Sequence, residues 1–436
     1  MLVALTVAGS DSIGGAGIEA DLKAFSSMGV HGTCVVTAVT SQNTMRVADI
    51  LPMPVRHVTS QLAAVLDDAE VASAKTGMLY SARIAKAVAR RLACENFPIV
   101  VDPVMIASVG NTLHQKHLVL ALKTDIIPIA KVVTPNRHEA EALSDIPVRT
   151  LRDARKACEI ICDMGAEAVV IKGGHFSTPE ATDLLLHRGV FYEISAPRLP
   201  AHVHGGGCAL SSFIAGNLAR GMDVRQAVVA SKSMITEAIR SSYAVGKGIA
   251  VVNPLAALEK EAGKFAVMSS LRKAVDEMLP LLEPSLIPEV GINFVYALPN
   301  ATELGEVCGL DGRILSITGK ARHCGGIAFG SSRHVAMIVL TAMRFDREKR
   351  SAMNIRYTPE NLSKLRAAGL SIGSFDRRRE PKGRKTMEWG TAKVIEKAGA
   401  VPDAIYDEGG LGKEAMIRLL GRDPEDVLAK MRRVVG

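Results

Sequence analysis

Three consecutive glycines stand directly before a cysteine at the start of an expected helix. The stretch HGGGCALSSFIAG covers residues 204–216, and Gly205, Gly206 and Gly207 precede Cys208. A glycine-rich turn at a helix N-terminus leaves backbone N–H groups free to bind an anion such as a phosphate. The positive end of the helix dipole also favours a thiolate, so we expect the pKa of Cys208 to be lowered. Such turns also occur as simple packing elements, so the rest of the sequence must show whether this turn binds an anion.

Four further segments carry residue types that phosphoryl transfer requires. A glycine-rich loop opens the first helix and three later segments follow expected strands; together they contribute Asp21, Asp102, Asn136, Glu139 and Lys172. Carboxylates at strand ends suit Mg²⁺, and a lysine there can contact a nucleotide phosphate. Each segment alone is more often a capped helix or a solvated loop. Their order and spacing together favour a phosphoryl-transfer site.

The first 250 residues alternate apolar runs with amphipathic stretches such as residues 17–29. This alternation is typical of an α/β fold built on a mostly parallel sheet. Expected strands cover residues 2–9, 33–40, 97–105, 131–136 and 168–174. Because such sheets bind ligands at the carboxyl ends of their strands, we expect the segments above to meet there.

The pattern changes near Gly263, where we predict a domain boundary. A terminal helix followed by a polar connector is expected there, before a new amphipathic helix begins. Further strands are expected near residues 312–317, 352–356, 369–374 and 403–407. The chain is therefore predicted to consist of a first domain over residues 1–263 and a second, smaller α/β domain over residues 264–436.

Basic side chains recur around the glycine-rich turns of the second domain. They are Arg313, His334, Arg356, Arg377 and Lys413. A single histidine in the first turn of an apolar helix is more often an ordinary surface or core residue. The clustering favours an anion site, because guanidinium groups bind phosphates well and a histidine can donate to a phosphate or move a proton.

The composition is that of a soluble protein, with 48% hydrophobic and 22% charged residues. The N-terminus lacks the features of a signal peptide, and no apolar run approaches the roughly 20 residues of a membrane span. The seven cysteines include no CxxC pair, which argues against a zinc site and a disulfide framework. The net charge of +8 fits anionic small substrates, and no basic run interleaved with aromatic residues indicates nucleic-acid binding. We expect a cytoplasmic protein.

Residues 1–250 resemble the hydroxymethylpyrimidine and hydroxymethylpyrimidine-phosphate kinases of the ribokinase-like superfamily. The segments that carry this resemblance are AGSDSIGGAGIEADLK, VTSQNT, KTGML, VVDPVM, TPNRHEAEAL, IKGGH and HGGGCALSS. The sequence departs from the family at Gly206, where a threonine is usual, and at Ile13, where a glycine is usual. Neither departure removes a backbone donor, because every residue except proline supplies an N–H group.

The resemblance implies roles for individual residues. Asp21 and Gln42 would hold the pyrimidine with Met78 packed near it, and the backbone of residues 205–208 would form the anion hole. Asp102 and Glu139 would serve Mg²⁺, while Lys172 and Asn136 would contact the nucleotide, ATP. Cys208 would stand where most of the superfamily has an aspartate base.

Residues 265–436 resemble the archaeal-type thiamin-phosphate synthase domain. The segments that carry this resemblance include GRILSITGKARHCGGIAFGSSRHVAMIVLTAM, MNIRY, MEWGTA and PDAIYDEGGLGKEAMIRLLG, although Ala415 stands where a proline is expected. The resemblance implies that a pyrimidine diphosphate and a thiazole phosphate condense there and release pyrophosphate. Arg313 and His334 would be the functional pair, with Arg356, Arg377 and Lys413 completing the anion site.

Two other interpretations remain open. The second domain could be a non-catalytic ligand-sensing module, although no helix-turn-helix candidate precedes it. The first domain could be a pyridoxal kinase, because Cys208 is compatible with both acceptors. We expect a homo-oligomer, most simply a dimer, in either case.

Overall fold

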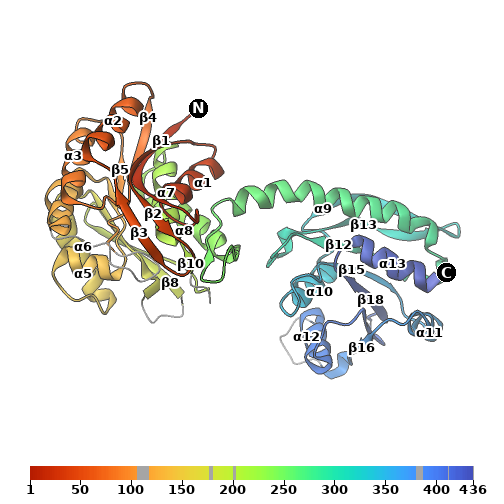
Figure 1. The fold of residues 1–436 in the computed structure, drawn as a ribbon. Helices are drawn as coiled ribbons and strands as arrows, with labels where there is room; N and C mark the ends of the chain where they lie inside the picture. Colours follow the sequence, from red (N-terminus) through yellow and green to blue (C-terminus); the bar gives the residue numbers. More distant parts are fainter. Residues whose placement is uncertain (106–116, 176–179, 200–202, 380–385, 411, 436) are drawn as a thin grey trace. The chain divides into compact units, whose positions relative to one another are not determined.

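The computed structural model describes residues 1–436 except 106–116, 176–179, 200–202, 380–385, 411 and 436. It divides into two compact units, Met1–Leu258 and Glu259–Gly436 (Figure 1). No helix among the described residues is both long enough and apolar enough to cross a lipid bilayer.

The first unit is built on a nine-stranded sheet with the strand order β3-β2-β1-β4-β5-β6-β7-β8-β9. The strands are β1 (Val3–Asp11), β2 (His31–Gln42), β3 (Val47–Pro52), β4 (Val71–Thr76), β5 (Ile99–Val101), β6 (Val132–Val133), β7 (Ala168–Ile171), β8 (Glu180–His187) and β9 (Val190–Pro197). Neighbouring strands from β2 to β7 in this order pair in parallel. At one edge β3 pairs antiparallel with β2, and at the other β8 pairs antiparallel with both β7 and β9. The expected mostly parallel sheet is confirmed.

Helices cover both faces of this sheet (Figure 1). One face packs against α2 (Val55–Leu66), α3 (Ala82–Leu92), α4 (Leu118–Ala121), α5 (Arg137–Ser144) and α6 (Leu151–Asp163). The other face packs against α1 (Gly17–Ser27), α7 (Gly206–Ala219) and α8 (Val224–Arg240). The central strands β5, β6 and β7 are apolar along their whole length because both of their faces are buried.

A short parallel pair, β10 (Val203–His204) and β11 (Ala250–Val251), lies beside the start of α7. The main strands end with their carboxyl ends at one edge of the sheet. Asp102 follows β5, Asn136 follows β6 and Lys172 follows β7. The sheet topology therefore brings to one edge the segments that the sequence singled out.

The second unit contains a seven-stranded sheet with the order β14-β13-β12-β15-β18-β17-β16. Its strands are β12 (Phe294–Ala297), β13 (Val307–Ile317), β14 (Lys320–Phe329), β15 (Ser351–Arg356), β16 (Ile372–Ser374), β17 (Ala404–Asp407) and β18 (Met416–Gly421). All pairs are antiparallel except β16 with β17. Side chains of β12 alternate between two cores, since Phe294 and Tyr296 face one and Val295 and Ala297 face the other.

The helices of the second unit divide between these two cores. Those in the first are α9 (Ala256–Met278), α11 (Pro359–Ala367) and α13 (Pro424–Val435), and those in the second are α10 (Arg333–Met343) and α12 (Thr386–Ala398). Short helical turns of the second unit are η4 (Leu279–Leu281), η5 (Pro284–Leu286), η6 (Leu304–Glu306) and η7 (Arg377–Arg379). Those of the first unit are η1 (Leu122–Ile126), η2 (Ile127–Ile129) and η3 (Gly173–His175).

The expected polar connector around Gly263 is wrong, because Ala256–Met278 is one continuous helix, α9. A single glycine costs a helix only about 1 kcal/mol, and no proline interrupts the segment. The two compact units divide between Leu258 and Glu259, inside this helix and five residues before the expected boundary. Val267, Leu271 and Met278 of α9 are buried in a core of the second unit.

Candidate active sites

A small cavity of about 70 Å³ lies at the carboxyl ends of β1, β2 and β4. Three of the residues expected to form the acceptor site line it: Gln42, Met78 and Cys208. The remaining lining residues are Ala8, Gly9, Ser10, Asp11, Ala16, Gly17, Thr40, Lys75, Val104 and His204. The structure thus brings together one side chain from each of three distant segments of the sequence.

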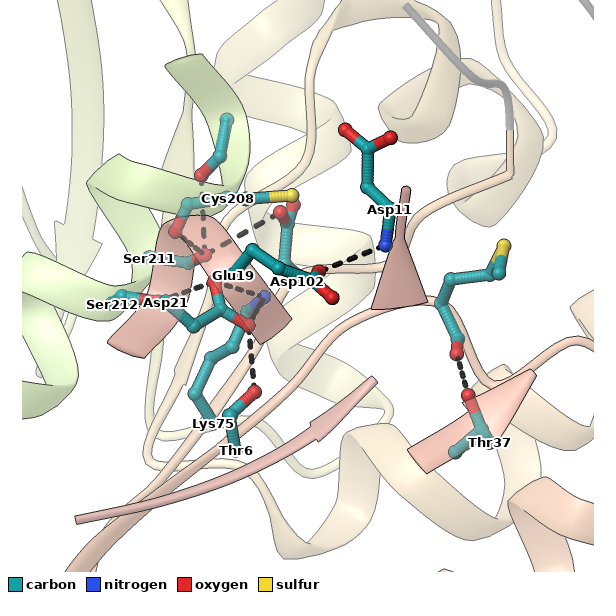
Figure 2. A network of polar contacts seen from close by, with 12 residues as sticks. Thr6, Asp11, Glu19, Asp21, Thr37, Lys75, Asp102, Cys208, Ser211 and Ser212 are labelled. Atoms are coloured by element: carbon teal, nitrogen blue, oxygen red, sulfur yellow. Dashed lines mark hydrogen bonds and ion pairs between the residues drawn. The ribbon is translucent and has the colours of Figure 1, made fainter. Parts of the chain in front are cut away.

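Asp21 does not line this cavity, contrary to its expected contact with the pyrimidine. Its carboxylate is fully buried and accepts hydrogen bonds from Lys75 at 2.8 and 2.9 Å, from Thr6 at 2.6 Å and from Ser212 at 2.7 Å (Figure 2). These donors occupy both carboxylate oxygens. Asp21 therefore holds Lys75 and helix α7 in place behind the cavity.

Lys75 is a functional candidate that the sequence analysis did not single out. Its side chain is fully buried, yet it lines the cavity and pairs with Asp21. Burial alone would lower the pKa of Lys75, but the carboxylate of Asp21 raises it above its usual value. A fixed positive charge therefore lies beneath Cys208. The segment KTGML contained this lysine, but no spacing in the sequence linked it to Asp21.

The expected lowering of the Cys208 pKa is wrong. Burial raises the pKa of the Cys208 thiol to about 11, although the cation of Lys75 opposes this rise. Cys208 lies in the first turn of α7, as expected, and Gly205 at the N-cap has φ of 87°. Desolvation of the thiolate outweighs the partial charge of the helix N-terminus here.

A second cluster lies directly beside the glycines. Nζ of Lys172 is 3.0 Å from Oδ1 of Asp102 and 3.7 Å from Oε2 of Glu139. A Cβ atom built on Gly207 would lie 3.3 Å from the same Nζ. Three residues expected at the phosphate and metal site therefore meet at the N-terminus of α7, next to the turn that carries Cys208.

The environment of Glu139 reflects this crowding. Burial raises the pKa of Glu139 to about 7, although Lys172 opposes the rise. Asn136 caps α5 by accepting the N–H of Glu139 at 3.0 Å, and Glu139 accepts the N–H of Asn136 at 2.7 Å. This capping box fixes the direction of the Glu139 side chain.

The donor set fits a magnesium ion that is shared with a nucleotide. Asp102 and Glu139 supply hard carboxylate oxygens, and proteins bind Mg²⁺ with one or two carboxylates plus substrate phosphates and water. No group of three or more metal-ligating side chains occurs in the described part of the chain.

In the second unit, one short segment contacts Arg313 and the N-cap of the helix that carries His334, the two residues of the expected functional pair. Arg313 donates to the carbonyl oxygen of Val290. Asn293 accepts a hydrogen bond from Ser332 at 3.0 Å, and Ser332 is the N-cap of α10, whose second residue is His334. Arg313 and His334 are both exposed. The segment Val290–Asn293 was not recognised from the sequence, because it carries no charged side chain.

The expected anion site of the second unit needs one correction. Arg377 does not present a free guanidinium group, because it pairs with the buried carboxylate of Asp407 at 2.5 Å, which also binds Arg418. Lys413 is exposed in the loop before β18, and Arg356 ends β15 half-buried. None of the described contacts joins Arg356, Arg377 and Lys413 to the pair Arg313 and His334. The Arg377–Asp407–Arg418 cluster instead ties η7 to β17 and β18.

Comparisons with known proteins assign both units. The phosphomethylpyrimidine kinase family matches residues 11–253, and the thiamine-phosphate synthase ThiN family matches residues 270–433. The bifunctional thiamine biosynthesis protein ThiDN of Methanocaldococcus jannaschii is 31% identical over 440 residues, which cover 99% of this chain and 97% of that protein. The chain belongs to this bifunctional family. It is an enzyme of thiamine biosynthesis with a kinase domain and a synthase domain.

Other relatives match the kinase domain of this bifunctional enzyme. The hydroxymethylpyrimidine/phosphomethylpyrimidine kinase of Haemophilus influenzae is 44% identical over 251 residues, or 56% of this chain and 93% of that protein. Among solved structures, pyridoxal kinase of Bacillus subtilis in its ADP complex aligns with a TM-score of 0.55 and 32% identity, over 59% of this chain and 99% of that one. Phosphomethylpyrimidine kinase of Clostridium difficile aligns with a TM-score of 0.50 and 38% identity, over 55% of this chain and all of that one. The kinase domain has the ribokinase-like fold.

Proposed function

We propose that the kinase domain transfers the γ-phosphoryl group of ATP to hydroxymethylpyrimidine and then to its monophosphate, giving the diphosphate. The observation that carries this proposal is the position of the cavity. Cys208 lines the cavity, and its neighbour Gly207 faces Lys172 and Asp102. An acceptor in the cavity would therefore lie beside the groups that bind the transferred phosphate.

In the first transfer, the hydroxymethyl oxygen bonds to the γ-phosphorus, the bond to the β-phosphate oxygen breaks, and ADP leaves. Backbone N–H groups of residues 205–208 and the cation of Lys172 stabilise the negative charge on the transferring group. The thiolate form of Cys208 would accept the hydroxyl proton. Asp102 and Glu139 would hold Mg²⁺, which neutralises phosphate charge when bound.

The synthase domain would join this diphosphate to a thiazole phosphate, giving thiamin phosphate and pyrophosphate. The ring nitrogen of the thiazole attacks the methylene carbon while the bond from that carbon to the pyrophosphate oxygen breaks. Arg313 would neutralise the leaving pyrophosphate, and His334 would donate to one of its oxygens. Both side chains are exposed, so a substrate can reach them.

A coupled reaction tests the whole proposal. The chain is incubated with ATP, Mg²⁺, hydroxymethylpyrimidine and thiazole phosphate, and thiamin phosphate is measured by its oxidation to a fluorescent product. We expect product only when all four components are present. Product from supplied pyrimidine diphosphate, but none from hydroxymethylpyrimidine and ATP, would contradict the kinase part alone.

Pyridoxal is a second candidate acceptor for the kinase domain. The likeness to pyridoxal kinases of Bacillus subtilis and of Staphylococcus aureus, the latter with a TM-score of 0.55 and 30% identity, favours this possibility. Competition between pyridoxal and hydroxymethylpyrimidine for one site would distinguish a dual-specificity kinase from a strict one. We also expect a cytoplasmic homodimer, which light scattering and cell fractionation would test.

A further inference from the structure

The side chains of Asp11 and His204 form a buried contact between two glycine-rich segments. Nε2 of His204 lies 2.7 Å from Oδ2 of Asp11, and the residues are 1% and 4% exposed. Asp11 ends β1, and His204 ends β10 directly before Gly205. The contact therefore joins the loop that lines the acceptor cavity to the turn that enters α7.

Asp11 also organises its own loop. Its carboxylate accepts the backbone N–H groups of Ile13 at 3.2 Å, Gly15 at 3.0 Å and Ala16 at 2.8 Å. Burial would raise the pKa of Asp11, but the hydrogen bond and charge of His204 and these backbone donors hold it below its usual value. An ionised carboxylate only accepts hydrogen bonds, so Nε2 of His204 must carry the proton.

The two segments are packed without spare room around this contact. A Cβ atom on Gly15 would lie 2.4 Å from Cδ2 of His204, and one on Gly205 would lie 1.7 Å from the carbonyl oxygen of Gly15. The backbone of His204 is held as well, since its carbonyl accepts the N–H of Val252 at 3.0 Å. A change in the Asp11–His204 contact would therefore shift both segments.

Gln42 meets the same histidine nitrogen. In the structure the amide nitrogen of Gln42 lies 2.9 Å from Nε2 of His204, and Gln42 lines the cavity. The NH₂ group of Gln42 and a protonated Nε2 of His204 cannot hydrogen-bond to each other, because both are donors. Because Asp11 requires the proton on Nε2, we assign the opposite orientation of the amide, in which its oxygen shares this proton with Asp11 and its NH₂ group is left for the cavity.

We propose that Asp11 and His204 are a positioning pair for the kinase, and that they orient Gln42 so that its NH₂ group donates to an acceptor nitrogen of a heteroaromatic substrate. The pair would set both the affinity for the heterocycle and its alignment with the α7 N-terminus. This inference rests on the proposed function of the kinase domain, because it assumes a heteroaromatic acceptor in the cavity.

The first test compares His204→Phe with His204→Gln in the full chain. Phenylalanine removes the donor, whereas glutamine keeps an N–H group. We expect His204→Phe to raise the KM for hydroxymethylpyrimidine by roughly tenfold to a hundredfold and to raise the KM for ATP much less. His204→Gln should recover part of this loss. A KM for hydroxymethylpyrimidine equal to that of the wild type in His204→Phe overturns the proposal, as does an equal rise in both KM values.

A substrate analogue in which CH replaces the accepting ring nitrogen tests the orientation of Gln42. We expect this change to raise the KM about tenfold in the wild type and much less in His204→Phe, whose amide is free to turn. An equal penalty in both proteins contradicts the assigned orientation. Synthase activity from supplied pyrimidine diphosphate and the melting temperature report whether each variant is folded.

A measurement that does not use activity separates this inference from the proposed function. In a chain labelled with ¹⁵N-histidine, the ring signals lost in His204→Phe should show a proton on Nε2 in the wild type. An unprotonated Nε2 overturns the pairing. A protonated Nε2 in a chain that phosphorylates no hydroxymethylpyrimidine would support the Asp11–His204 contact and contradict the proposed substrate.

Discussion

Nζ of Lys172 lies 3.0 Å from Oδ1 of Asp102, and the two residues follow the strands that flank β6 on either side. Asp102 is 2% exposed, so this lysine provides the positive charge that its carboxylate needs in the ligand-free protein. In the proposed function the same charge would face the phosphates of ATP. The contact would then serve both stability and phosphoryl transfer.

Replacement of this lysine should affect both properties. We expect Lys172→Met to lower the kcat/KM for ATP by about 10²–10³-fold, because a fixed charge at the transferring phosphate is lost. The melting temperature should also fall, since Asp102 is left buried without its partner. The matched control is Lys131→Met, because Lys131 forms only a half-exposed pair with Glu167 and should leave both measurements unchanged. A full loss in the control would contradict this account.

The raised pKa of Cys208 predicts a pH dependence for the first phosphorylation. With a pKa of about 11, the thiolate fraction at lower pH increases about tenfold for each unit by which the pH is raised. If Cys208 is the base, kcat for hydroxymethylpyrimidine should rise in this way between pH 7 and 9. The monophosphate is mostly dianionic at pH 7, since its second pKa is about 6, and its phosphorylation should change little.

Cys208→Ala separates the same two steps at one pH. We expect it to slow phosphorylation of hydroxymethylpyrimidine by about 10²–10⁴-fold and that of the monophosphate far less, because the backbone N–H at position 208 is retained. Steady-state rates with both acceptors provide the measurement. Equal losses would mean that Cys208 acts through the phosphate site and not as a base.

Most central strands of the kinase domain were predictable, because burial on both faces makes them continuous hydrophobic runs. The central strand β4 was missed, since Ser73, Lys75 and Thr76 interrupt its apolar run. The edge strands β3 and β9 were missed, since their side chains are mostly exposed and give no such run. In the second unit, β14 was missed for a related reason. Its residues Lys320, Arg322 and Cys324 are exposed, and two glycines interrupt its apolar pattern.

The site could be predicted only where a residue stands in a local motif. Gly205–Gly207, Cys208 and Lys172 could each be recognised from their immediate neighbours. The pair of Asp11 and His204 is 193 residues apart, and that of Asp21 and Lys75 is 54 residues apart. Neither separation follows from a helix or strand period, so only the folded sheet brings these partners together.

Substitutions at Arg313 and His334 should impair the synthase activity of the second unit and leave the kinase activity of the first unit intact. We expect Arg313→Ala and His334→Ala each to lower thiamin phosphate formation from supplied diphosphate by at least about 10²-fold, because charge stabilisation of the leaving pyrophosphate is removed. Kinase activity should remain. Arg322→Ala is the control, since Arg322 is an exposed residue of β14 on the same hairpin. Equal loss of both activities would indicate misfolding and not a role in catalysis.

The two compact units should function as separate fragments. Each has its own buried cores, and α9 contributes its apolar side chains to a core of the second unit. We expect residues 1–258 to phosphorylate hydroxymethylpyrimidine twice, and residues 259–436 to make thiamin phosphate from the diphosphate. Circular dichroism provides the folding control. A folded but inactive first fragment would show that the kinase requires its partner domain.

The glycine that replaces the usual threonine should not be required. A Cβ atom on Gly206 would meet only Val203, at 3.6 Å, so Gly206→Thr should raise the free energy of unfolding by about 0.5–1 kcal/mol and retain kinase activity. Gly205→Ala should have the opposite effect, because φ at Gly205 is 87° and the new Cβ would collide with Gly15. Thermal unfolding and kinase assays on both variants check this contrast.

The protonated thiol of Cys208 also has a consequence for oxidative damage. Peroxides attack the thiolate and convert it first to a sulfenic acid, so a thiol with a pKa of about 11 is oxidised slowly at neutral pH. The burial that limits Cys208 as a base between turnovers therefore protects it when the site is empty.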